Sequence, residues 1–102
     1  MKTYKITDDA KNDLIEIAQY TLNKWGKKSF NEYRVGLEGI FDTIANRTVI
    51  QRKISEKLPN VFVTKYKYHF IFYIYENNNA IIIAVIHEKR DILKHLTHRL
   101  ET

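Results

Sequence analysis

Two histidines and a tyrosine are the side chains of this 102-residue chain with the clearest chemical potential. His69, Tyr73 and His87 lie in the second half of the sequence, within segments rich in aliphatic and aromatic residues. A ribonuclease without a metal needs a base for the 2′-hydroxyl proton, an acid for the leaving group and a cation for the developing negative charge. These three residues are the candidate acid and base groups. The structural alternative is a pair of histidines hydrogen-bonded to backbone at strand ends, and a core tyrosine with its hydroxyl at the rim.

Basic residues near this group are the candidates for binding a partner or a nucleic acid. They are Arg52, Lys53, Lys65, Lys67 and Arg90. The alternation of Lys65 with Lys67 predicts that both amines project from one face of a strand. That arrangement suits a phosphate or an acidic protein, and it equally suits a solvated edge strand. Arg90 precedes Asp91, whose residue type is typical of a helix N-cap. The alternative to a binding role for Arg90 is therefore an exposed position next to this cap.

The sequence gives no sign of a cofactor or a metal site. The chain has no cysteine, which excludes disulfides and thiolate zinc ligands. It also lacks a glycine-rich phosphate loop and a Gly-x-Ser-x-Gly elbow. His95 and His98 share a spacing of three, but without a supporting carboxylate this pair is typical of solvated histidines near a helix end. We therefore expect no cofactor and no metal.

Positive charge is concentrated in the second half of the chain. The net charge is +5, of which residues 1–51 carry +1 and residues 52–102 carry +4. A nucleic acid and an acidic protein partner would explain this surplus equally well. The N-terminal residues lack an apolar signal core, and no apolar run approaches the roughly 20 residues needed to span a bilayer. We expect a cytoplasmic protein without a membrane segment.

The first half of the chain predicts a strand followed by two helices. Residues 2–7 alternate polar with apolar side chains, and Thr7, Asp8 or Asp9 is suited to cap the helix that follows. Gly26 ends the apolar stripe of that helix. A second helix is expected from a capping box formed by Ser29 and Glu32.

Two glycines interrupt the expected second helix. Gly36 and Gly39 each cost up to about 1 kcal/mol relative to alanine in a helix interior. Close approach of this helix to the first helix or to the sheet explains them. The two helices therefore form a hairpin that packs against another layer.

From about residue 52 the apolar period becomes that of strands. Segments 52–58, 61–67, 68–76 and 80–87 predict an antiparallel meander, and Asp91 begins a short terminal helix. The single domain, residues 1–102, is thus expected to be α+β, with a helical hairpin on a curved, mainly antiparallel sheet of about four strands. Because segment 68–76 is apolar on both faces, the terminal helix or a partner chain must cover the face that the hairpin leaves.

The chain resembles the RelE/ParE superfamily of toxins from type II toxin–antitoxin modules, and within it the ParE, or plasmid-stabilisation, branch. The matching residues are Ala10, Asp13, Leu14, Ile17, Tyr20, Trp25, Gly26, Tyr33, Leu37, Phe41, Pro59, Asn60, His69, Tyr73, His87, Arg90 and Asp91. No one of them is specific, but their order and spacing extend over nearly the whole chain.

The resemblance implies a RelE/ParE-like fold and a cognate, ParD-like antitoxin whose C-terminal tail wraps the toxin in a hetero-oligomer. It also implies growth arrest through direct inhibition of DNA gyrase, without established hydrolytic residues. The alternatives are a ribosome-dependent mRNA endonuclease using His69, Tyr73 and His87, and a decayed toxin that retains antitoxin binding only. Phe62 and Phe70 stand where the superfamily often has arginine. Because an apolar ring cannot stabilise a phosphorane, Phe70 favours a binding protein over a nuclease.

Overall fold

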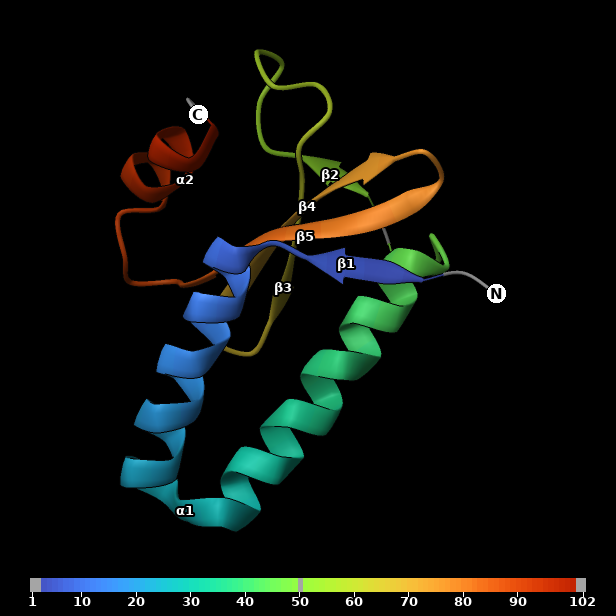
Figure 1. The fold of residues 1–102 in the computed structure, drawn as a ribbon. Coiled ribbons are helices and arrows are strands. Elements are labelled where there is room, and N and C mark those ends of the chain that lie inside the picture. The colour runs from blue at the N-terminus through green and yellow to red at the C-terminus, as the bar shows by residue number, and fades with distance from the viewer. Residues whose placement is uncertain (1–2, 50, 101–102) are drawn as a thin grey trace.

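The computed structural model describes residues 3–49 and 51–100, which form a helical hairpin, a five-stranded mixed sheet and a short C-terminal helix (Figure 1). The strands are β1 (Tyr4–Ile6), β2 (Arg52–Lys53), β3 (Phe62–Tyr66), β4 (His69–Glu76) and β5 (Asn79–His87). Their order across the sheet is β1-β5-β4-β3-β2, with β1 parallel to β5 and the other pairs antiparallel. The α+β prediction is confirmed, and each of the five expected strand segments contributes a strand to the sheet. Residue 2 of the expected first strand lies outside the described residues.

The hairpin is one long helical element, α1 (Asp8–Ala45), which is sharply bent at Gly26. Gly26 has φ 90° and ψ 178°, a conformation that side chains with a Cβ atom rarely adopt. Thr7 is the N-cap, because its side-chain oxygen accepts a hydrogen bond from the Ala10 amide at 3.2 Å. Helical backbone resumes directly after Gly26, so Ser29 lies inside the second arm and the expected capping box is wrong.

The sheet has an apolar core on each face. On the hairpin side, Leu37, Phe41 and Ile44 of α1 pack with Ile71 and Ile82 of the central strands. On the other side, a second core includes Val61, Phe72 and Ile86, together with Leu96 of the C-terminal helix α2 (Ile92–Leu100). The alternation predicted for segment 68–76 is therefore confirmed, and α2 supplies part of the expected cover.

Segment 52–58 departs from its strand prediction, because only its first two residues pair with β3. The remainder turns on itself: the Leu58 amide donates to the Ser55 carbonyl and the Val61 amide donates to the Leu58 carbonyl. Ile54 and Leu58 thereby pack against the second core. Asp91 does cap α2, accepting a hydrogen bond from the Lys94 amide at 3.1 Å. None of the helices in the described part of the chain is both long enough and apolar enough to cross a membrane.

The two helical glycines have different surroundings. A Cβ atom built on Gly36 would lie 1.8 Å from the Tyr66 hydroxyl oxygen and 2.6 Å from the ring carbon that bears it. The predicted close approach is therefore confirmed at Gly36. At Gly39 a Cβ atom would meet nothing within 4 Å, so the same explanation is wrong there.

We expect Gly36→Ala to destabilise the protein by about 1–3 kcal/mol, because the Tyr66 ring must leave its place between α1 and β3. Gly39→Ala is the matched control, and it should stabilise the protein by up to about 1 kcal/mol through helix propensity alone. Urea unfolding of the two variants measures both effects. Equal stabilisation by the two substitutions would show that Tyr66 does not restrict this position.

Candidate functional site

A cleft of about 1100 Å³ opens between the two arms of α1 and one end of the sheet. Its walls come from residues 13–25 of the first arm, 29–33 of the second arm, and His95 and Arg99 of α2, and its floor comes from residues 67–69 and 85–90. The bend at Gly26 closes the hairpin at the far end. The hairpin extends beyond the sheet (Figure 1), and the cleft lies between its two arms and the end of the sheet.

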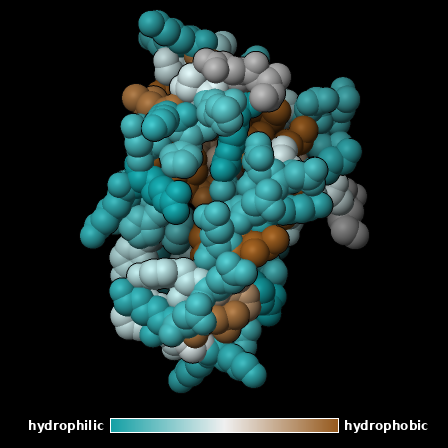
Figure 2. All heavy atoms as spheres, turned by 60° about the vertical axis from the view of Figure 1, so that its left-hand side comes forward, coloured by the Kyte–Doolittle hydropathy of each residue, from teal (hydrophilic) through white to brown (hydrophobic). Residues whose placement is uncertain are grey.

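Aromatic side chains line the cleft and remain accessible. Tyr20, Trp25 and Tyr68 are 59%, 63% and 62% exposed, although each has a large apolar ring. The Lys24 amine lies over the Tyr20 and Trp25 rings, at 5.4 and 5.3 Å from their centroids. Exposed aromatic rings of this kind dominate the binding energy of many protein–protein interfaces. The surrounding face is otherwise mainly hydrophilic, with separate hydrophobic patches (Figure 2).

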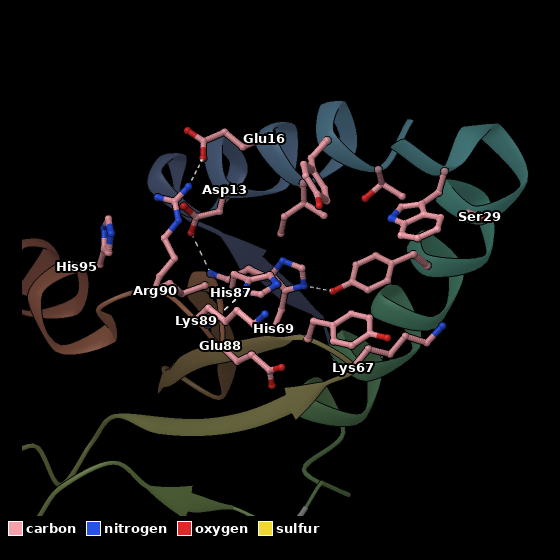
Figure 3. A pocket seen from close by; sticks show the side chains of 18 of the residues that line it. Asp13, Glu16, Ser29, Lys67, His69, His87, Glu88, Lys89, Arg90 and His95 are labelled. Carbon is pink, nitrogen blue, oxygen red and sulfur yellow. Dashed lines mark hydrogen bonds and ion pairs between the residues drawn. The ribbon is translucent and has the colours of Figure 1, made fainter. Parts of the chain in front are cut away.

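His69 and His87 lie next to each other at the floor of the cleft (Figure 3). They are direct partners in the β4–β5 register, with ring centroids 5.1 Å apart and the rings nearly perpendicular. The Tyr33 hydroxyl is 2.5 Å from Nδ1 of His69. Burial, and next to it the neighbouring His87, lower the pKa of His69 to about 4. Burial also raises the pKa of Tyr33. Both groups of this hydrogen bond are therefore neutral at pH 7.

His87 fits the structural alternative of a histidine bonded to backbone at a strand end. The Lys89 amide donates a hydrogen bond to Nδ1 of His87 at 3.1 Å, just after β5 ends. The Tyr68 ring stacks on the His87 ring, with centroids 6.5 Å apart. Two contacts thus fix the orientation of the imidazole.

Tyr73 does not join the two histidines. Its side chain is fully buried in the core on the hairpin side of the sheet, four residues along β4 from His69. At the usual strand rise this separation is about 13 Å. Burial raises the pKa of Tyr73 to about 12, and its hydroxyl has no hydrogen-bond partner among the described residues. The expectation of a hydroxyl at the rim is wrong, and the side chain is not accessible to a substrate.

The candidate basic residues divide between two regions. Lys67 and Arg90 line the cleft, whereas Arg52 and Lys65 line a smaller hollow of about 340 Å³ beside Val63. Lys53 is exposed on the short strand β2. The sequence pattern did not predict this division.

Lys65 and Lys67 do not share a face, contrary to the prediction. The Lys65 amine lies over the Phe70 ring and 2.6 Å from a Glu88 carboxylate oxygen, whereas Lys67 lies over the Tyr33 and Tyr66 rings. The reason is a change in backbone direction, since Lys67 has φ 52° in the turn between β3 and β4. Lys65 also holds the pKa of Glu88 below its usual value.

Asp13 connects three elements at the wall of the cleft. Its carboxylate accepts two hydrogen bonds from the Arg99 guanidinium at 2.6 Å and a third from the Val85 amide at 2.9 Å. Arg99 also donates to the Ile83 carbonyl at 3.2 Å. The side chains of Arg99 and Asp13 are only 17% and 14% exposed. This pair therefore joins α1, β5 and α2 in a partly desolvated setting.

Charges along the cleft are balanced. The acidic lining residues are Asp13, Glu16, Glu32 and Glu88, and the basic lining residues are Lys67, Lys89, Arg90 and Arg99. Arg90 also forms an ion pair with Glu16 (Figure 3), in which the nitrogen and oxygen atoms are 3.8 Å apart. In the described part of the chain, no group of three or more His, Asp or Glu side chains is placed to hold a metal ion.

Sequence reasoning missed Tyr33 and the Asp13–Arg99 pair as parts of the site. Tyr33 is 36 residues from His69, and an apolar stripe on a helix does not show which hydroxyl will meet a strand. Asp13 did leave a signal, because it is a charged residue on the face that Ala10 and Ile17 present to the sheet. A charge on a buried helix face requires a partner, although the sequence does not identify it.

These features define a small α+β protein with a cleft of about 1100 Å³ between a helical hairpin and a sheet. Residues 4–92 match the family model described as the ParE toxin of the type II toxin–antitoxin system, parDE. The chain therefore belongs to the ParE toxin family of type II toxin–antitoxin systems. It is 28% identical over 102 residues to Toxin ParE of Escherichia coli, covering 99% of each chain.

A solved structure shares the fold. The chain is similar to one from the chromosomal ParDE TA system from P. aeruginosa, with a TM-score of 0.71 and 14% identity. The match covers 85% of this chain and 96% of that one. This structural match confirms the α+β fold that the resemblance implies, although the two sequences are only 14% identical.

We expect Arg99→Ala to lower the free energy of unfolding by about 3 kcal/mol, because it leaves a partly buried Asp13 carboxylate without its cation. Arg90→Ala is the control: its ion pair with Glu16 is long and exposed, so stability should change by less than about 1 kcal/mol. Chemical unfolding of both variants distinguishes the two roles. A similar loss in both would mean that Arg90 is structural.

The depressed pKa of His69 predicts a pH dependence of stability. The unfolded chain has the ordinary value of 6.5, so it binds more protons than the folded chain between pH 6.5 and about 4. Stability should therefore fall as the pH is lowered through this window. His87→Gln removes the second cause of the shift, so the pKa of His69 should rise but stay below 6.5, because burial remains. NMR titration of the imidazole protons measures both values, and a wild-type midpoint near 6.5 would contradict the argument.

Proposed function

We propose that this member of the ParE family acts in the cytoplasm by binding DNA gyrase directly, and that a cognate ParD-like antitoxin neutralises it in a hetero-oligomer. The observation that carries the antitoxin part of the proposal is the cleft, which combines accessible aromatic rings with balanced charge. The choice of gyrase as the target is supported by membership of the ParE family. A protein segment suits such a surface, because aromatic anchors contribute affinity and paired charges contribute specificity. A nucleic-acid site would instead need a surplus of positive charge along its length.

The arrangement of the candidate acid and base groups supports a binding role over ribonuclease activity. Tyr73 is buried, and Phe70 packs with the core on the other face of the sheet from the histidines. His69 has a pKa of about 4, so at neutral pH it is a weak base. Lys65 is neutralised by Glu88, which removes one cation from the proposed phosphate contacts.

The family resemblance supports the choice of partners. Members of the family are described as toxins of parDE systems, and the solved relative is named for a ParDE system. An antitoxin tail that enters the cleft would bury the exposed rings of Tyr20, Trp25 and Tyr68. The basic residues that lie away from the cleft, Arg52 and Lys53, remain available for the target.

Purified protein should inhibit supercoiling by DNA gyrase, and addition of the antitoxin encoded beside its gene should restore it. The double substitution Arg52→Ala and Lys53→Ala should weaken inhibition several-fold without loss of stability, since both side chains are exposed. Val35→Ala, at an exposed apolar position outside the cleft, is the matched control.

Full supercoiling activity in a large molar excess of folded protein would contradict gyrase inhibition. New cuts in ribosome-bound mRNA after induction would favour the endonuclease instead. Antitoxin binding without growth arrest would identify a decayed toxin.

A further inference from the structure

The hydrogen bonds of the two cleft histidines determine where their protons lie. His87 accepts the Lys89 backbone N–H at Nδ1, and a backbone amide is only ever a donor. Nδ1 of His87 is therefore unprotonated, and the proton of the neutral ring is on Nε2. The ring geometry places Nε2 on the side of the imidazole away from the Lys89 amide.

For His69, the same tautomer is the one that accepts a hydrogen bond from Tyr33. The hydroxyl is 2.5 Å from Nδ1, and burial raises the pKa of Tyr33, so the phenol keeps its proton. The phenol can therefore donate this proton to Nδ1 of His69. His69 is then an Nε2–H tautomer as well.

Two histidines on adjacent strands thus line the cleft floor, each with Nε2–H as its available donor. His69 and His87 are directly opposite in the register, with centroids 5.1 Å apart. The nearby carboxylates already have partners: Asp13 binds Arg99 and the Val85 amide, and Glu88 binds Lys65. Two neighbouring donors suit the two oxygens of a single oxyanion.

We propose that His69 and His87 form a receptor for one carboxylate of the antitoxin segment that fills the cleft, each imidazole donating its Nε2–H. This inference rests on the proposed antitoxin partner and adds the chemical group that is recognised. Tyr33 is a positioning residue, because it acts on the carboxylate only through the tautomer of His69.

A carboxylate of a protein suits this place better than a phosphate of a nucleic acid. The cleft lining has as many acidic as basic residues, and Glu16 lies opposite the floor near Arg90. A chain of phosphates would meet those carboxylates on either side, whereas one Asp or Glu side chain needs only the two donors. The aromatic rings nearby would pack against the apolar neighbours of that acidic residue.

The tautomers can be measured with the protein alone. Long-range ¹H–¹⁵N correlation spectra at pH 7 should show both imidazoles protonated at Nε2. Tyr33→Phe should leave the His87 tautomer unchanged and mix the tautomers of His69. A wild-type Nδ1–H tautomer at either residue would overturn the proposal, whatever the partner.

Binding is measured by calorimetry with the antitoxin encoded beside the gene. His87→Leu and His69→Leu should each weaken binding about 10- to 100-fold, the range for a hydrogen bond to a charged group. Gln places its amide N–H near the position of Nε2–H, so His87→Gln and His69→Gln should retain affinity within about threefold. Val35→Ala is the control outside the cleft, and melting curves confirm that each variant is folded.

Changing the acidic residues of the antitoxin to amides, one at a time, should identify one whose loss weakens binding to wild type but not to His87→Leu. Unchanged affinity in both Leu variants, Gln variants as weak as Leu variants, or absence of such an acidic residue would each overturn the proposal. Single-stranded RNA that binds the wild type and not His87→Leu would overturn it in favour of a phosphate. Failure of wild type to bind the antitoxin at all would overturn the antitoxin pairing itself.

Discussion

The carboxylate of Asp13 is the contact on which the arrangement of the cleft depends. It accepts hydrogen bonds from the Val85 amide and from Arg99, and so connects the first arm of α1 to β5 and to α2. β1 covers the outer edge of β5 only as far as Ile82, so the Val85 amide beyond it would otherwise lack a strand partner. Asp13 satisfies that amide, and Arg99 neutralises the carboxylate. The same interaction that completes the sheet edge therefore sets the position of one cleft wall.

β5 is the second constraint, because it belongs to both cores. It pairs with β1 and β4, and the register shifts between Phe72 and Tyr73, leaving Ile83 without an opposite residue. The irregularity lets Ile82 face the hairpin while Ile83 and Ala84 both join the core beneath α2. Beyond it the alternation resumes, and His87 comes to lie opposite His69. The register shift between Phe72 and Tyr73 thus determines both which residues of β5 face each core and which residue lies opposite His69.

Local sequence patterns were sufficient to predict most of this fold. They fail where contacts between distant residues determine strand pairing, or where a turn changes the direction of a side chain. Helical periodicity and Gly26 predict the hairpin, and the change to a strand period predicts β3, β4 and β5. The parallel pairing of β1 with β5 joins residues nearly 80 positions apart, which no local pattern indicates. The alternation of Lys65 and Lys67 misleads because it extends across a turn with positive φ. In the site, residue types indicated the histidines, but the contact with Tyr33 required the tertiary structure.

The burial that makes His69 a weak base is compatible with the recognition role proposed above. General base catalysis is most effective when the pKa of the base is close to the working pH, and His69 is well below that. In the proposed arrangement each imidazole accepts a hydrogen bond at Nδ1, from Tyr33 for His69 and from the Lys89 amide for His87, so Nε2–H is a donor in a fixed direction. Fixed donors lose little entropy on binding, so they favour affinity and specificity. Because the acidic and basic residues that line the cleft are equal in number, its charge suits a single carboxylate better than a polyanion.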